Sequence, residues 1–508
     1  MSSMNPTNDT GSNRGGTVGK VGNYRWVICA LLFIATTTNY IDRNALGVLK
    51  PFLQEHLGWD EVDYGWIVFA FVGAYAAFPS IVGIFIDKVG VKKSLAIALI
   101  VWSLAAAAHG LVATVVGFVI VRFFLGVAEA ANFPASIKAV AMWFPQKERA
   151  LATGIFNSGT SVGVIAAPIT VLLAQTLGWQ WSFILMGLIG FIWLYFWQRS
   201  FHPPEVHPHV GAAELDYIRS GQKAAEQNVK LPWSAMVRYR QIWPFLIGKF
   251  LTDPVWWFYL FWLPTYLNVE RGQNLLKSAG LMAIIYTGSS VGSVFGGWLS
   301  GHLIRKGWHV GKARMTTMLL AAIFMPGSIL AYFTDNFAVC VGFITLATAC
   351  HQWWSANIFT SATDLFPQKV SGSVVGLGAT AGGIGGMFIA LLAALAIQWT
   401  GKQELVFIWA AFMHLTSIAI YWFWFKGHFD PVDVDAGIDL HSRHTPLLAS
   451  GSVIAIVGVA LMLLIGLNWE VCVQATSLSG AAQALTAALG VFVIGGGLTY
   501  AGMAKTPR

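Results

Sequence analysis

Long apolar runs alternate with short polar connections along most of the chain. Each run contains about 20 mostly apolar residues, the length of helix that crosses the hydrocarbon core of a bilayer. The pattern therefore predicts six membrane-spanning helices, a longer polar segment, and then six more. These twelve runs lie at 24–47, 62–86, 94–111, 113–142, 149–175, 180–199, 243–268, 278–304, 315–334, 337–362, 371–398 and 404–425.

The polar segments divide the chain into regions. The start is rich in Gly, Ser and Thr and shows no signal-peptide pattern, so we expect a disordered cytoplasmic tail. Two more apolar runs, 447–468 and 480–502, predict an extra hairpin that packs on the bundle or meets another subunit, or else a lipid-facing pair with no role in transport. The regions are the tail (1–23), the first six helices (24–200), a cytoplasmic central loop (201–242), the second six helices (243–426), a linker (427–446) and the hairpin with the C-terminal tail (447–508).

Composition excludes a soluble protein. Charged residues make up 11% of the chain and hydrophobic residues 56%, whereas soluble domains carry about 25% charged residues. The net charge of +8 comes from short basic clusters between the apolar runs, so no basic face predicts a nucleic-acid partner. Four cysteines form no disulfide framework. We therefore expect an all-α membrane protein in a lipid bilayer.

Lysine and arginine are distributed unevenly between the two sides of the predicted membrane. They gather in the N-terminal tail, the even-numbered connections, the linker and the C-terminal tail. Basic residues are enriched in cytoplasmic loops. We therefore expect a multi-pass inner (cytoplasmic) membrane protein with both termini and the central loop in the cytoplasm. The odd-numbered connections hold only Lys50, Arg271, Lys277 and Lys402.

The two sets of six runs repeat each other. The tetrapeptide Phe-Pro-Gln-Lys occurs at 144–147, after the fourth run, and again at 366–369, after the tenth. Behind each copy glycines keep the same spacing, at Gly154 and Gly163 and at Gly376 and Gly385. One tetrapeptide can recur by chance, but its equivalent place in both halves favours a duplication. Duplicated six-helix halves are typical of transporters that bind substrate at the midplane between the halves.

A glycine- and lysine-rich loop joins the second and third runs. Gly83 and Gly90 permit close helix approach and a tight turn, and Asp87 can cap or pair with a neighbouring helix end. Lys88 faces the anionic cytoplasmic surface. The spacing resembles the signature loop of the major facilitator superfamily. The equivalent loop of the second half follows the eighth run, and there Gly301 stands in place of the acid. Any contact by which these loops lock the two halves together (an interlock) is therefore expected to be one-sided, with an acid at the first loop and none at the second. The alternative is that both loops are only cytoplasmic anchors.

Charged residues also lie inside the apolar runs. Asp42 and Arg43 end the first run, and Arg122 and Glu129 lie two helical turns apart in the fourth. Pro134 follows them and is expected to kink or loosen this helix. Such charges cost roughly 2.5 kcal/mol or more each at the bilayer centre, so they usually face the bundle interior. They could form structural ion pairs. Desolvation and a neighbouring arginine oppose each other on a carboxyl group, and this balance lets it exchange a proton near neutral pH.

These residues resemble a known family. Residues 39–43 (Asn-Tyr-Ile-Asp-Arg) and 122–135 (Arg-Phe-Phe-Leu-Gly-Val-Ala-Glu-Ala-Ala-Asn-Phe-Pro-Ala) are similar to the anion:cation symporter family within the major facilitator superfamily. The resemblance covers roughly 24–426 and implies a fold of two six-helix bundles related by pseudo-twofold symmetry. The passages at 143–157, 247–259, 351–357 and 372–376 resemble the hexuronate transporters of that family.

The resemblance also implies roles for individual residues. Asp42 and Glu129 match the acids that carry protons, and Arg122 matches the arginine that pairs with the first acid. Arg43 matches the arginine that engages the substrate carboxylate. Thr160 stands where relatives that transport sugar acids can carry glutamine, which leaves the exact substrate open. Tyr40 and Tyr75 match tyrosines that line the sugar-acid site in this family.

Physical chemistry gives independent reasons for a similar set. A carboxylate prefers the planar fork of arginine, buried hydroxyls need polar partners, and the apolar face of a pyranose stacks on an aromatic ring. Lys249 and Asp253 are polar residues in the seventh run that can simply pair with each other. The candidate rings include Trp256 and Trp257, although a tryptophan in a bundle is commonly structural. The candidate substrate-binding residues are Arg43, Tyr40, Tyr75, Asn157, Thr160, His351, Trp354 and Asn357.

We therefore predict a proton-coupled symporter that imports galacturonate or glucuronate and functions as a monomer. The sequence has no Gly-Lys-Ser/Thr phosphate loop and no His-Glu-x-x-His motif. We therefore expect no ATP drive, no enzyme activity, no cofactor and no metal. One alternative keeps the proton coupling and changes the cargo to an aldonate, an aldarate or an aromatic acid such as phthalate. Another is a transporter-like sensor that binds solute without moving it.

Overall fold

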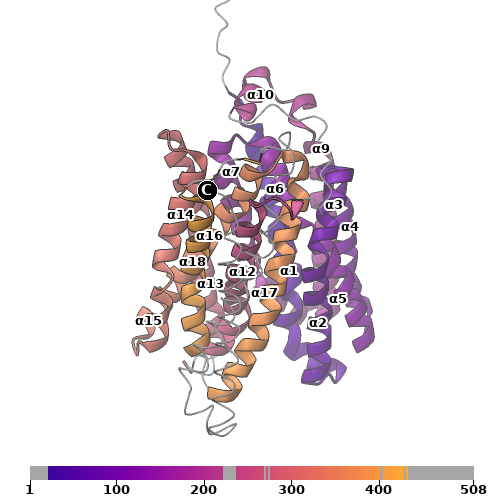
Figure 1. Ribbon diagram of the computed structural model, residues 1–508. Helices are drawn as coiled ribbons and strands as arrows, with labels where there is room; N and C mark the ends of the chain where they lie inside the picture. Colours follow the sequence, from indigo (N-terminus) through magenta and orange to yellow (C-terminus); the bar gives the residue numbers. More distant parts are fainter. Residues whose placement is uncertain are drawn as a thin grey trace, which may run out of the picture.

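The chain folds into a bundle of long helices. The computed structural model describes residues 21–220, 236–267, 271–272, 275–400, 404–427, 429 and 431–432, and within these it contains helices and no β-strand. Figure 1 shows the long helices running roughly side by side, with the short helix α10 (Ala212–Arg219) beyond one end. We call this end the α10 end. The predicted hairpin at 447–508, most of the tail at 1–23 and the middle of the central loop lie outside the described residues.

The first six predicted runs form the N-terminal half, in which several runs are divided into two helices. A 3-10 turn, η1 (His109–Leu111), follows α4, and another, η2 (Pro204–Val206), precedes α10. The long helices are α1 (Tyr24–Leu57), α2 (Glu61–Ala77), α3 (Pro79–Val89), α4 (Val91–Ala108), α5 (Val115–Glu129), α6 (Asn132–Trp143), α7 (Gln146–Ile165), α8 (Ala167–Leu177) and α9 (Trp179–Ser200).

The second six runs form the C-terminal half. The short turn η4 (Gln368–Val370) lies between the helices α16 and α17 of this half. By length and composition alone, six described helical segments suffice to cross a membrane, or up to eight if each of two bent pairs counts as one span. The helices of this half are α12 (Ile242–Thr265), α13 (Leu275–Arg305), α14 (Val310–Phe324), α15 (Gly327–Phe333), α16 (Phe337–Leu365), α17 (Ser371–Thr400) and α18 (Glu404–Phe425).

Prolines account for the places where a predicted run divides. Pro79 is the first residue of α3, which is bent by 50° from α2. Pro134 lies in the first turn of α6, and the helix breaks just before it because a proline nitrogen has no hydrogen to donate to an earlier carbonyl. Pro168 near the start of α8 and Pro326 before α15 mark two further breaks. The kink expected at Pro134 is therefore present as a break at Ala130 and Ala131.

The first helix is longer than its hydropathy predicts. The run was expected to end at residue 47, but α1 continues to Leu57. Leu49 and Leu53, four residues apart and so on one face of the helix, are both fully buried. Gly58 ends the helix in the left-handed conformation, with φ of 69°. Packing of this one face therefore stabilises the helix beyond residue 47, although the average hydropathy falls there.

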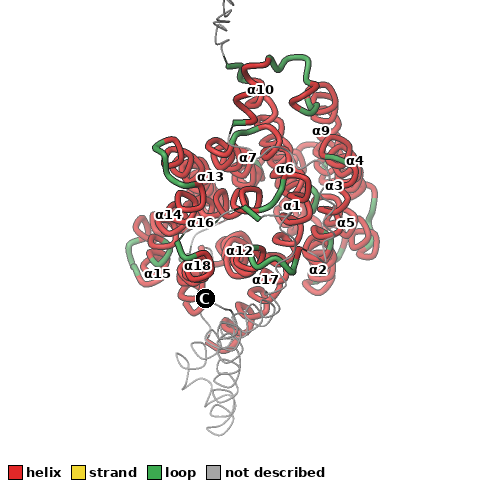
Figure 2. Tube along the Cα trace, turned by 45° about the horizontal axis from the view of Figure 1, so that its top comes forward, coloured by secondary structure: helices red, strands yellow, loops and turns green. Residues whose placement is uncertain are grey.

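The two halves meet through equivalent pairs of helices near the α10 end. A side chain at Gly83 of α3 would run into the backbone of Gly372 of α17, and one at Gly297 of α13 would run into the backbone of Ala150 of α7. Ala150 and Gly372 hold equivalent places behind the two Phe-Pro-Gln-Lys copies. The two contacts are therefore related by the pseudo-twofold symmetry that the repeat predicted. Figure 2 shows α13 and α16 beside α7, and α17 beside α2.

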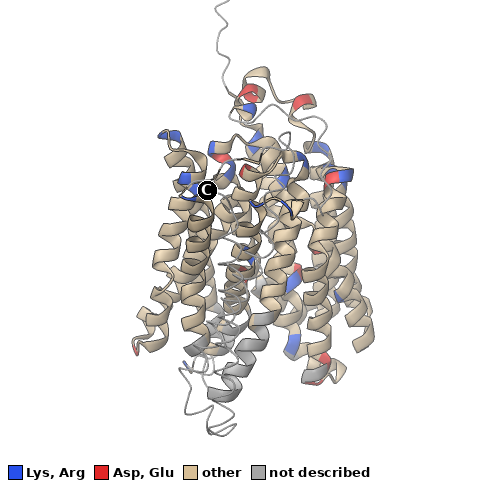
Figure 3. Ribbon diagram, in the orientation of Figure 1, with Lys and Arg blue, Asp and Glu red and all other residues tan. Residues whose placement is uncertain are grey.

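The helix α10 is held onto the start of the bundle by buried charges. Arg25 of α1 pairs with Glu148 of α7 at 2.8 Å and with Glu214 of α10 at 3.4 Å. Tyr217 of α10 donates a hydrogen bond to Glu148, and burial, together with this bond, raises the pKa of Tyr217 to about 12. Lysine, arginine and acidic residues gather at this same end (Figure 3). The predicted cytoplasmic orientation of this end is based on its lysines and arginines.

Candidate functional site

Arg43 and Glu129 form a buried ion pair between α1 and α5. The Arg43 Nε donates to Glu129 Oε2 at 3.0 Å, and the two side chains are 4% and 0% exposed. Arg43 Nη2 also donates to Asn39 Oδ1 at 3.2 Å. Among the described residues, Arg43 Nη1 and Glu129 Oε1 have no hydrogen-bond partner. The pair therefore keeps one donor and one acceptor that a ligand or water can satisfy.

Aromatic rings surround the Arg43 guanidinium. Its central carbon lies 4.2 Å from the ring centre of Tyr75, 4.4 Å from that of Tyr40 and 5.4 Å from that of Phe71. Trp257 of α12 adds a ring from the C-terminal half at 5.9 Å. Aromatic faces attract a cation, so the rings hold the guanidinium in place without neutralising it. The predicted residues Tyr40, Tyr75 and Arg43 thus lie together.

The other two predicted charges belong to the same cluster. Asp42 is 5% exposed and interacts electrostatically with Glu129 and Arg122. Arg122 is 2% exposed, and its Nη1 donates to the Arg43 carbonyl oxygen at 3.3 Å. Arg122 Nε and Nη2 find no hydrogen-bond partner in the part of the chain that the structure describes. Two acids and two arginines are therefore gathered within α1 and α5, and the hydrogen-bonded ion pair is Arg43 with Glu129.

Asn157 and Thr160 of α7 face the C-terminal half. Asn157 Nδ2 donates to Gln352 Oε1 at 2.6 Å and to Ser293 Oγ at 3.2 Å. Gln352 Nε2 in turn donates to Thr160 Oγ1 at 3.3 Å. Gln352 of α16 thus places an amide of the other half beside Thr160. Sequence reasoning missed Gln352, although it directly follows His351 in a passage already singled out.

The remaining candidates on α16 make hydrogen bonds inside the C-terminal half. His351 Nδ1 lies 3.2 Å from His414 Nε2, and its ring stacks on Trp256. Trp354 Nε1 donates to Thr252 Oγ1 at 3.1 Å. Asn357 Nδ2 donates to the Gly296 carbonyl at 3.1 Å. His351 reaches a ring of α12 beside Trp257, whereas the hydrogen bonds of Trp354 and Asn357 connect helices of this half to one another.

The loop after α3 interlocks with the other half. Asp87 accepts hydrogen bonds from the backbone nitrogens of Gly372 and Ser373, at 3.1 and 2.7 Å, and from Lys138 Nζ. Its carboxylate thereby caps the N-terminus of α17, where the helix dipole favours negative charge. Lys88 lies in the last turn of α3, and Gly90, with φ of 88°, makes the turn into α4. Of the two readings of this loop, the geometry supports the interlock.

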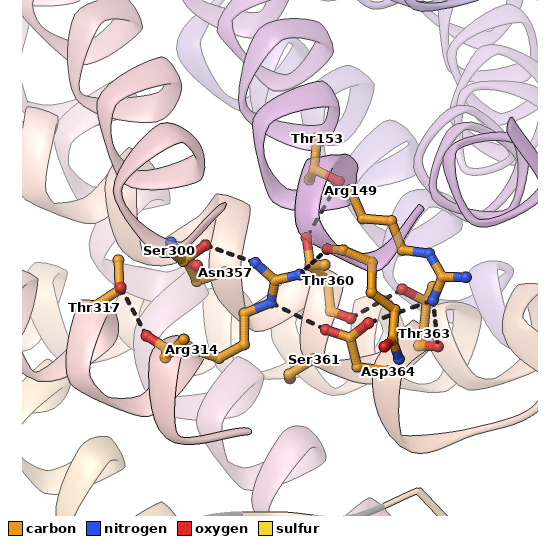
Figure 4. Close-up of polar contacts among 12 residues, drawn as sticks. Arg149, Thr153, Ser300, Arg314, Thr317, Asn357, Thr360, Ser361, Thr363 and Asp364 are labelled. Atoms are coloured by element: carbon orange, nitrogen blue, oxygen red, sulfur yellow. Dashed lines mark hydrogen bonds and ion pairs between the residues drawn. The ribbon is translucent and has the colours of Figure 1, made fainter. Parts of the chain in front are cut away.

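A second interlock has an acid that the sequence analysis did not anticipate. Asp364, near the end of α16, pairs with Arg149 of α7 at 3.3 Å and with Arg314 of α14 at 3.0 Å. Arg314 Nη2 also donates to the Gln146 carbonyl of α7 at 2.9 Å. Figure 4 shows the Asp364 carboxylate between the two arginines. The expected one-sided interlock is therefore wrong, because α16 provides the acid that Gly301 lacks.

The described residues contain no group of three or more His, Cys, Asp or Glu side chains placed to hold a metal ion. The three cysteines among them, Cys29, Cys340 and Cys350, are buried free thiols.

Comparison with known proteins identifies the family. A family model described as Major Facilitator Superfamily matches residues 32–390. The D-galactonate transporter of Escherichia coli O6:H1 (strain CFT073) is 30% identical, over 77% of this chain and 93% of that relative. The hexuronate transporter of Escherichia coli (strain K12) is 29% identical, over 79% of this chain and 94% of the relative.

A solved structure shows the same fold at low sequence identity. The proton:xylose symporter XylE, bound to 6-bromo-6-deoxy-D-glucose, superposes with a TM-score of 0.63 and 13% identity, over 78% of this chain and 95% of that one. The family model covers more than half of the chain, and its members are membrane transporters and not enzymes. The chain therefore belongs to the major facilitator superfamily, as the resemblance predicted.

Proposed function

We propose that the chain imports a hexuronate, galacturonate or glucuronate, together with protons, by alternating access between its two halves. The observation that carries this proposal is the buried Arg43–Glu129 pair at 3.0 Å, surrounded by aromatic rings from both halves. Relatives that are named as hexuronate and D-galactonate transporters support a sugar-acid cargo.

The ion pair couples the substrate to a proton because two carboxylates compete for one guanidinium. A buried arginine that loses its only counter-charge is strongly disfavoured, so Arg43 holds either ionised Glu129 or the substrate carboxylate. Protonation of Glu129 releases the guanidinium, whose planar fork then takes the substrate carboxylate with two parallel hydrogen bonds. Proton and anion thus occupy the site together, and each leaves when the other does.

Asp42 and Arg122 complete this exchange. Arg122 lies behind Arg43, with two donor groups that no described residue satisfies, and it interacts electrostatically with both acids. When substrate is absent, the positive charge of Arg122 disfavours the protonated form of either carboxyl group. Asp42 offers a second proton-carrying group within the same cluster. The neutral donors and acceptors needed by sugar hydroxyls come from Asn157 and Gln352 between the halves.

Alternating access in this proposal depends on the two interlocks at the α10 end. Asp87 binds the start of α17, and Asp364 binds α7 and α14. Both must open before substrate can leave through this end, which the distribution of basic residues assigns to the cytoplasm. Both interlocks must then close again before the opposite end can open for the next substrate. The interlocks therefore ensure that the two ends open in turn.

An aldonate is the second candidate cargo. The D-galactonate transporter is as similar to this chain as the hexuronate transporter is, and Thr160 leaves the hydroxyl contacts open. Competition between labelled galacturonate and unlabelled galactonate, galactarate or phthalate distinguishes these acids. Movement of any of them by purified protein excludes a sensor that only binds.

The direct test is uptake of labelled galacturonate into proteoliposomes containing the purified chain, with and without an imposed inward proton gradient. We expect accumulation with the gradient, and its collapse when a protonophore is added. Empty liposomes and unlabelled competitor serve as controls. Equal, non-accumulating uptake with and without the gradient would contradict proton coupling. Absence of galacturonate uptake by protein that accumulates galactonate would transfer the assignment to the aldonate.

A further inference from the structure

One face of α12 carries two charges and a ring that meets the Arg43 site. Lys249, Asp253 and Trp257 are each four residues apart, so they lie along one face of the helix. Trp257 lies 5.9 Å from the Arg43 guanidinium, and its ring contacts the Tyr75 ring edge-on at the same distance. The face that carries the two charges therefore continues into the ring that meets the Arg43 site, and along it the Asp253 carboxylate lies against Gly382 of α17.

Lys249 and Asp253 form an ion pair at the junction of the halves. The ammonium lies 2.7 Å from Asp253 Oδ2 and 3.5 Å from the ring centre of Phe359. Phe359 stacks on Phe133 of α6 at 5.2 Å, which places Lys249 beside the other half. The Lys249 side chain is 2% exposed, whereas that of Asp253 is 20% exposed. The carboxylate is thus the accessible member of the pair.

A charged pair at this depth costs free energy that packing alone does not justify. Charged groups inside a membrane are expensive, and they generally mark a substrate or ion pathway. A buried ion pair contributes little or no net stability compared with apolar side chains of the same size. The pair is also absent from the proton exchange derived above, which uses only α1 and α5. A role in binding accounts for a pair that stability does not require.

We infer that the Lys249–Asp253 pair binds the hydroxyl groups at the uncharged end of the substrate, opposite the carboxylate held by Arg43. This inference rests on the proposed function. An ammonium only donates hydrogen bonds and a carboxylate only accepts them, so neighbouring sugar hydroxyls, which do both, match the two groups together. Asp253 lies one helical turn, about 6 Å, from Trp257, a separation comparable to the length of one pyranose ring.

The pair also determines how many carboxylates the site accepts. Asp253 neutralises Lys249, so this end of the site has no net charge with which to attract a second carboxylate. A uronate or aldonate, with one acidic end, is therefore preferred over an aldarate, with two. Removal of the Asp253 charge leaves Lys249 as an uncompensated cation, which a second carboxylate can satisfy. The preference between one and two acidic groups is then expected to reverse.

The test compares galacturonate with galactarate, which carries a second carboxylate in place of the aldehyde carbon. KM for galacturonate and inhibition by galactarate are measured in proteoliposomes for the parent chain, Asp253→Asn, Asp253→Glu and Lys249→Gln. Loss of a hydrogen bond to a charged group is expected to raise KM for galacturonate in Asp253→Asn by about tenfold or more. In the same variant the ratio of galactarate to galacturonate affinity rises by about tenfold or more. Asp253→Glu keeps the parent ratio, and Lys249→Gln weakens both acids without favouring galactarate.

A control separates binding from folding. Thr252→Val removes a buried hydroxyl next to the pair, the one that accepts from Trp354, and it is expected to change the amount of active protein but not the ratio. If Asp253→Asn does not fold, the double variant Lys249→Gln/Asp253→Asn replaces it, with raised KM and no gain for galactarate expected. A parent chain that transports galacturonate while every variant keeps its ratio and KM would overturn this inference alone. A parent chain that neither binds nor moves either acid would overturn the proposed function and this inference with it.

Discussion

Asp364 of α16 and Arg149 of α7 join the two halves of the bundle by an ion pair of 3.3 Å, with both side chains buried. Arg314 binds the other oxygen of the same carboxylate at 3.0 Å. One acid is therefore shared by two arginines, and its removal leaves both of them buried without an acidic partner among the described residues. Breaking a buried pair in this way costs about 3–5 kcal/mol. The junction near Asp364 is for this reason the place where closure of the α10 end can be tested most simply.

We expect Asp364→Asn to open the α10 end. Thr360 and Thr153 meet across the halves with hydroxyls 3.3 Å apart and are both buried. The test places Thr360→Cys in a chain that also carries Cys472→Ser. The new thiol should resist a membrane-impermeant thiol reagent when Asp364 is present, and it should react when Asp364→Asn is added. Asp364→Glu, which keeps the charge, should remain protected. Equal protection in all three would show that the ion pair does not hold this end closed.

The equivalent glycine contacts of the two halves should respond alike to substitution. Gly83→Ala and Gly297→Ala each place a methyl group against the backbone of the opposite half, so each should lower the transport rate by preventing closure. The matched control is Gly73→Ala in α2, where nothing lies within 4 Å of the added carbon. That change should stabilise the chain or leave it unchanged, because alanine favours a helix by roughly 0.5–1 kcal/mol over glycine. Transport rate and the thermal unfolding midpoint in detergent measure both effects.

Asn157 and Gln352 should act as one unit across the halves. Residues that share a hydrogen bond show coupling energies of about 0.5–3 kcal/mol in double-mutant cycles. The loss of stability in Asn157→Ala/Gln352→Ala, measured by unfolding in detergent, should therefore be smaller than the sum of the single losses. Asn157→Ala combined with Asn357→Ala, whose hydrogen bonds go to other partners, should be additive. Additive behaviour of the first pair would mean that the 2.6 Å bond does not connect the halves.

The planar shape of Arg43 should matter as much as its charge. Arg43→Lys keeps the positive charge and loses the fork that binds a carboxylate with two hydrogen bonds. We expect KM for galacturonate to rise by about tenfold or more, since hydrogen bonds to charged groups contribute roughly 1.5–3 kcal/mol each. Uptake kinetics in proteoliposomes give this value. An unchanged KM would place the substrate carboxylate on another residue.

Much of the fold follows from the sequence because it depends on local patterns. Average hydropathy predicts the runs, and Pro134 predicts the break between α5 and α6, whereas the break at Pro79 was not predicted. The repeated tetrapeptide predicts which contacts are equivalent, as Gly83 and Gly297 confirm. The cost of burying charge predicts that Arg43, Glu129, Arg122 and Asp42 turn inward. Each of these inferences needs only neighbours in the chain or a general free-energy cost.

The pairing of these groups depends on how helices are rotated against one another, which no local pattern specifies. Arg43 bonds to Glu129 of another helix, although Asp42 adjoins it in the chain. Asp364 and Gln352 come from a helix more than 190 residues away from the α7 residues they meet. A polar residue in an apolar run therefore indicates that it has a partner, and the packed structure is needed to identify that partner.

The central claim is that Glu129 and the substrate carboxylate exchange on Arg43. The most direct measurement compares Glu129→Gln with the parent in two assays: galacturonate accumulation driven by a proton gradient, and exchange of labelled for unlabelled galacturonate without a gradient. Glutamine cannot release a proton but also cannot hold Arg43 by charge, so exchange should persist while accumulation is lost. Asp42→Asn shows whether the second acid is also required. Accumulation at the parent level in Glu129→Gln would contradict the account.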